Sequence, residues 1–240
     1  MRSKAVLAIL VALVAALMAA PASVSAAPCV PATGPVTLPV FVGGPPPGSG
    51  SPGCSFTAGS ITFTGAGGLQ FNGIGSFTPP TAAGITVAPE TLFGLPGLRF
   101  SGGMSAGAGS SLDIVFDYTA ASSGAPITDI HLTFNGAFTG TGSAEVVETV
   151  RDAVTGEVLG QAHVTNPPPV LDIVINLSRP AASVLITKDI LLRGGSAGSA
   201  TISFVDQLIT QGVPEPASLL LIGTGLVAVA LGRKRFFARG

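Results

Sequence analysis

The sequence has few charged residues, few histidines and no tryptophan, and these shortages exclude several classes of protein. Only 10% of the 240 residues are charged, against about 25% in an ordinary soluble domain, which excludes a coiled coil. Two cysteines and two histidines supply few of the ligands that zinc prefers, so we expect no metal site and no cofactor. The 33 glycines do not recur at every third position, which excludes a collagen.

Basic residues are scarce in the middle of the chain. Between residues 27 and 213 there are five Lys or Arg against eleven Asp or Glu, and all the remaining Lys and Arg lie near the two ends. Nucleic-acid binding needs clustered Lys and Arg side chains that neutralise phosphates. We therefore expect no nucleic-acid partner.

Residues 1–26 have the three parts of a secretory signal peptide. Arg2 and Lys4 precede an uncharged apolar run over residues 5–20, and small residues follow up to Ala26. Signal peptidase cleaves after such small residues, so we expect the cut between Ala26 and Ala27. An uncleaved N-terminal anchor is the alternative.

Export makes a disulfide the expected state of the two cysteines. Cys29 and Cys54 both lie in the mature chain, and an isolated pair in an oxidising compartment usually forms a disulfide. Closing the Pro- and Gly-rich segment between them stabilises the fold by roughly 3 kcal/mol in the chain-entropy model. The alternative is two unpaired thiols in a flexible arm.

The segment 213–240 contains a second targeting pattern. Its three parts are the triplet Pro214, Glu215, Pro216, an uncharged apolar run over residues 217–232, and the basic cluster Arg233, Lys234, Arg235. The run is 16 residues long, slightly below the about 17–25 residues of a membrane-spanning helix, a shortfall that flanking side chains or membrane thinning can cover. The basic cluster stays cytoplasmic by the positive-inside rule, which leaves the mature domain outside the membrane.

This layout resembles the PEP-CTERM sorting signal. The triplet 214–216, the apolar helix 217–232 and the basic end 233–235 match its three parts in order. The resemblance implies processing by exosortase, a membrane-embedded protease-transpeptidase of Gram-negative bacteria. It also implies a precursor held in the inner membrane by its C-terminal helix, then delivery to the cell surface or an exopolysaccharide matrix. An ordinary bitopic anchor is the alternative.

The middle of the chain predicts a β domain. Apolar and polar residues alternate over residues 112–118 and 129–134, as on a strand with one buried face. Similar runs occur at 171–177, 184–192 and 201–205, and residues 145–150 and 158–164 predict a hairpin. We predict an all-β fold of about eight to eleven strands, an antiparallel β-sandwich or jelly roll.

The predicted organisation has four parts. They are a signal helix (1–26), a Pro/Gly-rich, Cys-bounded arm (27–54), the sandwich (55–212) and the transmembrane sorting segment (213–240). The mature domain is itself similar to a recurring group of exported PEP-CTERM proteins. Residues 124–129, 140–142 with 147–149, 186–190 and the run into Val213 carry this similarity, which implies no activity.

No catalytic pattern is visible around the two histidines. His131 and His163 are 32 positions apart on predicted strands and lack the spacing of a zinc motif. No nucleophile motif such as GxSxG accompanies them. We expect both to face solvent or to form ordinary hydrogen bonds.

The acidic residues also predict no catalytic pair. Asp113 and Asp117 lie four apart on one strand, about 13 Å from each other on the same face, which is too far for a retaining glycosidase pair. Glu145 and Glu148 are three apart, so they face opposite sides of a strand. We expect all four to solvate the polar face of a sheet.

Three further features have structural explanations. Lys188 and Asp189 are expected to form a local surface ion pair, which contributes little. The glycines at 65–68 and 102–103 are expected in turns, because a phosphate loop also needs a Lys-Ser/Thr ending and a helix. Asp113, Asp117 and Asp172 do not follow the spacing of a calcium loop.

We expect an exported, exosortase-processed surface or biofilm-matrix protein without catalytic activity. Its expected partners are signal peptidase, exosortase and exopolysaccharide. A polysaccharide-binding module is the alternative, followed by a secreted hydrolase. Sugar sites usually use exposed aromatic side chains, whereas Trp is absent and the single tyrosine, Tyr118, falls on an inward face.

Overall fold

The structure, a computed structural model, describes residues 26–30, 34–43, 53–75 and 81–212. The signal helix and the sorting helix predicted at the two ends lie outside these ranges. Within them, no helix is long and apolar enough to cross a membrane.

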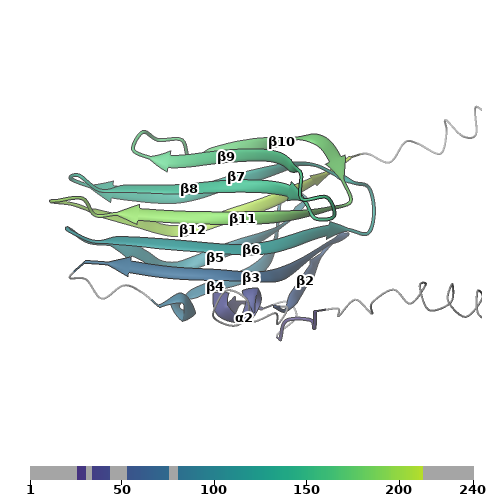
Figure 1. Ribbon diagram of the computed structural model, residues 1–240, viewed down its shortest axis with the longest axis horizontal. Coiled ribbons are helices and arrows are strands. Elements are labelled where there is room, and N and C mark those ends of the chain that lie inside the picture. Colours follow the sequence, from purple (N-terminus) through teal and green to yellow (C-terminus); the bar gives the residue numbers. More distant parts are fainter. Residues whose placement is uncertain (1–25, 31–33, 44–52, 76–80, 213–240) are drawn as a thin grey trace, which may run out of the picture.

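Two six-stranded sheets stack face to face (Figure 1). Sheet A has the order β2 (Ser55–Ala58), β3 (Ile61–Ile74), β6 (Ser111–Ser122), β11 (Ser183–Arg193), β8 (Ser143–Asp152) and β9 (Val158–Asn166). Sheet B has the order β1 (Val36–Thr37), β4 (Ile85–Leu92), β5 (Leu95–Ala106), β12 (Ser199–Gln211), β7 (Ile127–Thr139) and β10 (Asp172–Ala181). All named strand pairs are antiparallel, which confirms the predicted all-β sandwich.

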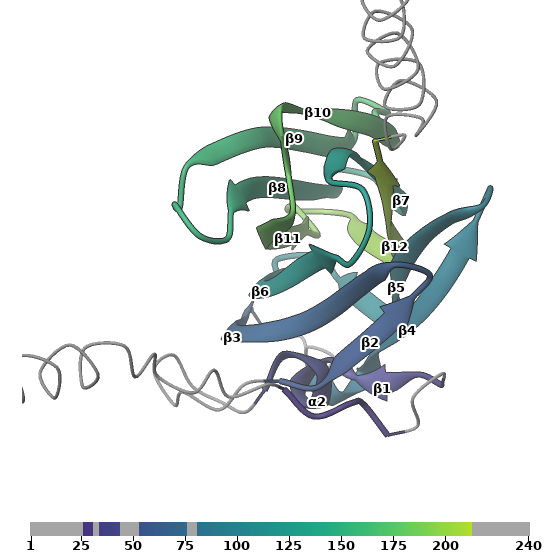
Figure 2. The ribbon, with the colours of Figure 1, turned by 90° about the vertical axis from the view of Figure 1, so that its right-hand side faces the viewer.

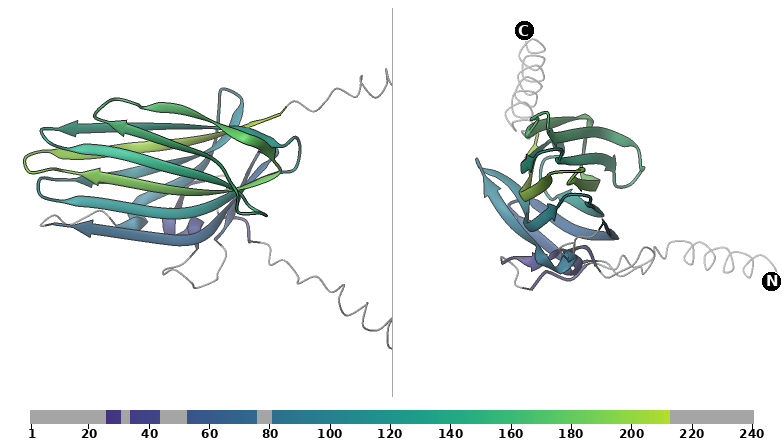
Figure 3. Two further views of the ribbon diagram at one scale, coloured as in Figure 1. Left: turned by 45° about the horizontal axis from the view of Figure 1, so that its top comes forward. Right: turned by 90° about the vertical axis from the view of Figure 1, so that its left-hand side faces the viewer.

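The chain passes repeatedly from one sheet to the other. Among the strands that the structure describes, only the β2–β3, β4–β5 and β8–β9 connections join neighbours in one sheet, and the last is the hairpin predicted from sequence. Figure 2 shows the two sheets end-on, with β9 and β10 close together at one edge. The strands run along the long axis of the sandwich (Figure 3). This crossing brings side chains that are distant in sequence together in one core.

The alternation on β6 separates a core face from a solvent face. Leu112, Ile114, Phe116 and Tyr118 are each at most 1% exposed, while the residues between them face outward. The same pattern over β7, β8 and β11 fills the space between the sheets with Ile, Val, Leu and Phe side chains. Burial of these apolar surfaces drives the stacking of the two sheets.

The segment before β2 contributes to the core, although its sequence predicts no regular structure. The short helix α2 (Leu38–Val42) accepts Pro39 because its first turn needs no N–H from that residue. Phe41 is fully buried and packs against the rings of Phe56, Phe100 and Tyr118. With five residues, α2 is too short to give a helical period, which is why the sequence pattern missed it.

The expected disulfide is confirmed. Cys29 and Cys54 are joined, with an S–S distance of 2.00 Å, and Cys29 is 1% exposed. The Cys29 N–H donates to the carbonyl of Ser55 at 2.9 Å, so the start of the segment also lies beside β2. The bond therefore fixes the chain on both sides of α2.

The glycines at 65–68 and 102–103, expected in turns, lie inside β3 and β5 instead. The register of β3 against β6 shifts twice between Gly65 and Gln70, so these glycines mark bulges. A Cβ on Gly65 would lie 1.9 Å from the Phe41 carbonyl oxygen, so only glycine lets α2 approach β3 this closely. The glycine run serves packing rather than chain reversal.

An unusual residue occupies the turn between β4 and β5. Phe93 has φ +53° and the following Gly94 has φ +80°. Two consecutive positive φ values are typical of a type I′ hairpin turn, which favours Asn or Gly over a bulky residue. Phe93 is 88% exposed, so its ring gains little packing in return.

Candidate functional site

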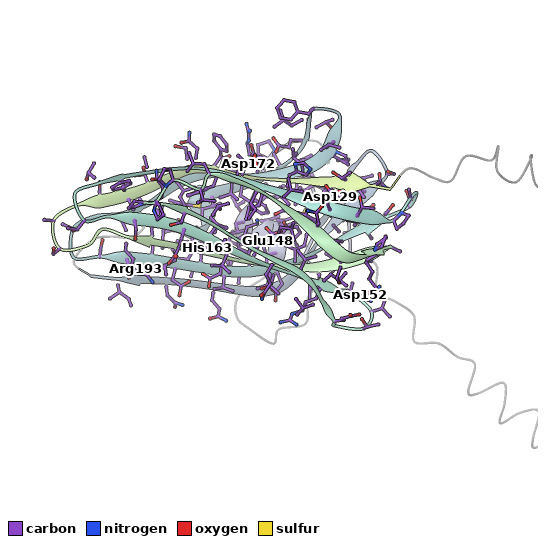
Figure 4. The ribbon with its side chains drawn as sticks, turned by 90° about the horizontal axis from the view of Figure 1, so that it is seen from above. Asp129, Glu148, Asp152, His163, Asp172 and Arg193 are labelled. Atoms are coloured by element: carbon purple, nitrogen blue, oxygen red, sulfur yellow. A yellow bond between two sulfur atoms is a disulfide. The ribbon has the colours of Figure 1, made fainter. Side chains whose placement is uncertain are left out.

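A buried polar cluster lies in the middle of the sandwich, and we call Lys188, Glu148 and Gln207 the core triad. Lys188 on β11 and Glu148 on β8 are direct partners in sheet A, and Gln207 reaches them from β12 of sheet B. All three residues are 0% exposed. Figure 4 shows Glu148 between the two sheets.

The core triad is closed by three hydrogen bonds. The Lys188 ammonium donates to Glu148 Oε2 at 2.5 Å and to Gln207 Oε1 at 2.7 Å. Gln207 Nε2 donates to Glu148 Oε1 at 3.0 Å. Each oxygen of the Glu148 carboxylate therefore contacts a different nitrogen, one of an amine and one of an amide.

Burial dominates the electrostatics of the core triad. Desolvation lowers the pKa of Lys188, while the charge of Glu148 and its hydrogen bond raise it in part. Nearby, burial raises the pKa of Tyr118, whose hydroxyl has no hydrogen-bond partner among the described residues. The Phe100 ring lies 5.7 Å from Lys188 Nζ. The cluster is thus an amine, an amide and a carboxyl in an aromatic core that excludes water.

The structure corrects two expectations about these residues. Lys188 does not pair with Asp189, because adjacent strand residues point to opposite faces, and Asp189 lies on the outside of sheet A. Glu148 does not solvate a polar face, whereas Glu145 does lie on the outer face, as its spacing from Glu148 predicts. The sequence signal for the buried lysine is its alternation with Ile186 and Ile190.

The outer face of sheet A gathers acidic residues. Asp189 on β11 faces Val115 of β6, so Asp113 and Asp117 are its diagonal neighbours on that strand. Glu145 of β8 lies diagonally on its other side. Burial raises the pKa of Asp189, and the charges of Asp113 and Glu145 raise it further. Sequence reasoning paired Asp113 with Asp117 and missed Asp189 between them, because Asp189 comes from another strand.

Two of these carboxylates each have an oxygen without a hydrogen-bond partner in the part of the chain that the structure describes. One oxygen each of Asp113 and Asp117 is shielded from solvent and has no hydrogen-bond partner among the described residues. The Asp117 side chain lies over Gly68, because a Cβ at position 68 would come within 2.7 Å of Asp117 Oδ2. No group of three or more His, Cys, Asp or Glu in the described ranges has an arrangement that holds a metal ion. This face therefore carries a group of carboxylates, two of which have one oxygen closed to solvent and without a partner among the described residues.

Each histidine lies beside a single carboxylate. His131 Nε2 is 3.1 Å from Asp129 Oδ1 on the outside of sheet B. His163 Nε2 is 3.1 Å from Glu145 Oε2, and Arg193 donates to the other oxygen of Glu145 at 2.8 Å. Figure 4 shows His163 and Arg193 on the sheet A side of the sandwich. Both histidines therefore have ordinary hydrogen-bond partners, and Glu145 links His163 to Arg193.

A second ionic cluster, on the outside of sheet B, is not apparent from sequence. Arg99 on β5 donates to both oxygens of Asp206 on β12, at 2.7 and 2.6 Å, and lies 4.6 Å from the centre of the Phe204 ring. Its Nε is also 3.4 Å from Glu90 Oε2 on β4. Burial and the neighbouring Asp206 raise the pKa of Glu90 from 4.5 to about 7, although Arg99 lowers it in part.

The turn between β8 and β9 contains a third ionic cluster. Asp152 Oδ1 accepts the N–H groups of Val154 and Thr155 at 2.8 and 2.9 Å, and Arg179 donates to its other oxygen at 2.9 Å. These backbone hydrogen bonds, with the guanidinium, lower the pKa of Asp152 from 3.8 to about 2. Gly156, with φ +74°, completes the turn. This cluster fixes the hairpin.

Comparison with protein families identifies the C-terminal segment. Residues 212–235 match the family described as PEP-CTERM protein-sorting motif. The chain carries a PEP-CTERM sorting signal. This motif implies an exported, membrane-anchored precursor that is processed by exosortase, as the resemblance of the triplet and the basic end predicts. A search among curated proteins finds no match to this chain.

Several solved structures are similar to part of this chain. The glycosylation-associated protein (Gap123) complex from Streptococcus agalactiae has a TM-score of 0.31 and 11% identity, covering 58% of this chain and 24% of that chain. TmCBM61 in complex with beta-1,4-galactotriose has a TM-score of 0.29 and 11% identity, covering 60% and 88%. The xylan-binding module CBM15 has a TM-score of 0.26 and 16% identity, covering 62% and 94%. At these scores the similarities carry no argument about function.

Proposed function

We propose that this protein is an exported surface or extracellular-matrix protein, without catalytic activity, that exosortase releases from the inner membrane. The observation that carries the proposal is the PEP-CTERM motif at residues 212–235. A sandwich with a disulfide between Cys29 and Cys54 suits an oxidising compartment outside the cytoplasm.

The test is the mass of the protein recovered from the envelope and the medium of its native host. We expect a chain that begins at Ala27, ends near Pro214 and contains the disulfide. A host that lacks exosortase should instead retain the precursor with residues 233–235 in the membrane fraction. A mature chain of identical length in both hosts would contradict the proposal.

Substitution of the triplet separates recognition from simple anchoring. Changing Glu215 and both flanking prolines to alanine should leave an unprocessed precursor in the membrane. Ser218→Ala, in the adjoining apolar run, is the matched control and should be processed normally. Processing of the triplet variant at the normal rate would show that an ordinary membrane anchor explains the segment.

A second candidate function is binding of a polysaccharide on the outer face of sheet A. The carboxylates of Asp113, Asp117 and Asp189, which gather on this face, favour it, because carboxylates accept hydrogen bonds from hydroxyl groups. Retention on the host's purified exopolysaccharide would test it. Asp113→Ala combined with Asp117→Ala should reduce retention, and Asp172→Ala on the exposed part of β10 should not. Equal retention of all three proteins would refute this binding face.

A further inference from the structure

The core triad brings together the three groups that an amide-forming reaction needs. An amine, the Nζ of Lys188, contacts a primary carboxamide, that of Gln207, at 2.7 Å from its oxygen. A carboxyl, that of Glu148, contacts the nitrogen of each. We propose that Lys188 and Gln207 join in an intramolecular isopeptide bond between the two sheets, with Glu148 transferring the protons.

The reaction balances without a cofactor or an oxidant. The neutral amine of Lys188 attacks Cδ of Gln207, a new C–N bond forms, and the Cδ–Nε2 bond breaks. The attacking nitrogen gives up one proton and Nε2 takes up one, so that it leaves as ammonia. Glu148, in its neutral form, delivers its proton to Nε2 from one oxygen and takes up the proton released by Nζ on the other, so it ends in its starting protonation state. No atom is oxidised or reduced.

The position of Glu148 suits this transfer. Its Oε2 lies 2.5 Å from the attacking nitrogen and its Oε1 lies 3.0 Å from the leaving nitrogen. Both distances fall within the reach that proton transfer requires. A single carboxyl therefore contacts the group that loses a proton and the group that gains one.

Burial supplies the reactive form of the lysine. An ammonium cannot attack a carbonyl, but desolvation lowers the pKa of Lys188 and so favours the free amine. Moving one proton from Lys188 to Glu148 leaves a neutral amine and a neutral acid, which removes two charges from a core with no exposure to water. Desolvated lysines act as nucleophiles in covalent catalysis for the same reason.

The fold supplies the proximity. β11 and β12 are central strands of their sheets, and their facing side chains are held by strand pairing on both sides. Holding two reacting groups in contact replaces a bimolecular encounter by a step with a very high effective concentration. Because the product is part of the core, each chain reacts once, and the reaction requires no turnover.

The alternative role of the core triad is a hydrogen-bonded cluster that only fixes the pairing of the sheets. The two roles differ in composition, because the isopeptide bond removes one ammonia from the chain and the cluster removes nothing. Peptide mapping by mass spectrometry of the full protein from its native host distinguishes them. In the bonded protein, trypsin does not cut after Lys188, and the peptide that contains Lys188 remains joined to the one that contains Gln207.

We expect this joined peptide in the folded wild-type protein, lighter than its two parts together by one ammonia. Separate peptides of full mass, or an ammonia loss that maps to other residues, would overturn the proposal. Glu148→Gln should abolish the bond while retaining a hydrogen-bonding side chain, and Lys188→Gln should abolish it by removing the attacking amine. Asp189→Asn, on the opposite face of the same strand, is the control and should leave the bond intact.

Discussion

The Glu90–Arg99–Asp206 cluster predicts a specific pH dependence of stability. The pKa of Glu90 is raised from 4.5 to about 7 in the folded protein, so the fold favours its protonated form. Below pH 4.5 the side chain is protonated in both the folded and the unfolded state. As the pH rises from 4.5 to 7, the unfolded state releases this proton first. The contribution of Glu90 to stability is therefore complete at low pH and is lost as the pH rises through about 7.

The size of this effect follows from the shift in the pKa of Glu90. A pKa change from 4.5 to about 7 corresponds to about 3 kcal/mol in the free energy of unfolding. The cluster lies on the outside of sheet B and Arg99 is 41% exposed, so solvent screening reduces the measurable effect to about 1–2 kcal/mol. Glu90→Gln removes the titrating group and keeps an amide that can still donate to Asp206. The free energy of unfolding of this variant, relative to that of the wild type, should rise by about 1–2 kcal/mol between pH 4.5 and 7.5.

Urea unfolding followed by circular dichroism, at a series of pH values, measures this difference. The matched control is Asp152→Asn, because the pKa of Asp152 is lowered to about 2 and its effect has the opposite sign. Asp152 stabilises the fold above pH 3.8, and this contribution is lost as the pH falls through about 2. The difference between the wild type and Asp152→Asn should thus change only in acid. A difference between the wild type and Glu90→Gln that stays constant from pH 4 to 8 would refute the reasoning.

Three further predictions concern stability and use the same unfolding assay. Replacing Cys29 and Cys54 together with serine should lower the unfolding free energy by about 3 kcal/mol, and an unchanged midpoint would show that the bond does not constrain the unfolded chain. Phe41→Ala should cost about 3–5 kcal/mol, because the ring is fully buried among other aromatic rings. Val40→Ala on the exposed side of α2 should change stability by less than about 0.5 kcal/mol, and equal losses at both positions would contradict a core role for Phe41. Phe93→Gly should raise stability by about 1 kcal/mol by relieving the positive φ, whereas a loss would indicate that the Phe93 ring makes a stabilising contact.

Much of the strand pattern could be predicted from sequence because it is local. The alternation over residues 112–118 places Phe116 and Tyr118 inside, and the structure confirms it. The pairing partners could not be predicted in the same way, since they depend on which strands become neighbours. Lys188 meets Glu148 across 40 positions of sequence and Gln207 across 19. Nothing in the residues next to Lys188 specifies either contact.

The glycine run at 65–68 shows a second limit. Glycine in sequence indicates a turn, a bulge or a close approach of two backbones, and composition does not distinguish these. Here the choice depends on α2, which lies against Gly65 and whose own five residues give no periodic signal. The sorting motif was predictable because exosortase substrates are identified by a linear pattern, and a linear pattern needs no fold to be read.

The position of β12 has a mechanical consequence. The chain continues from this strand into the sorting motif, which starts at residue 212. A pull on the membrane-anchored end is therefore applied to a strand that pairs with β5 on one side and β7 on the other. When the force acts along such a strand, its two ladders of hydrogen bonds share the load, whereas a terminal edge strand would peel away one bond at a time. The precursor is thus tethered through a strand that is paired on both sides, not through an edge strand.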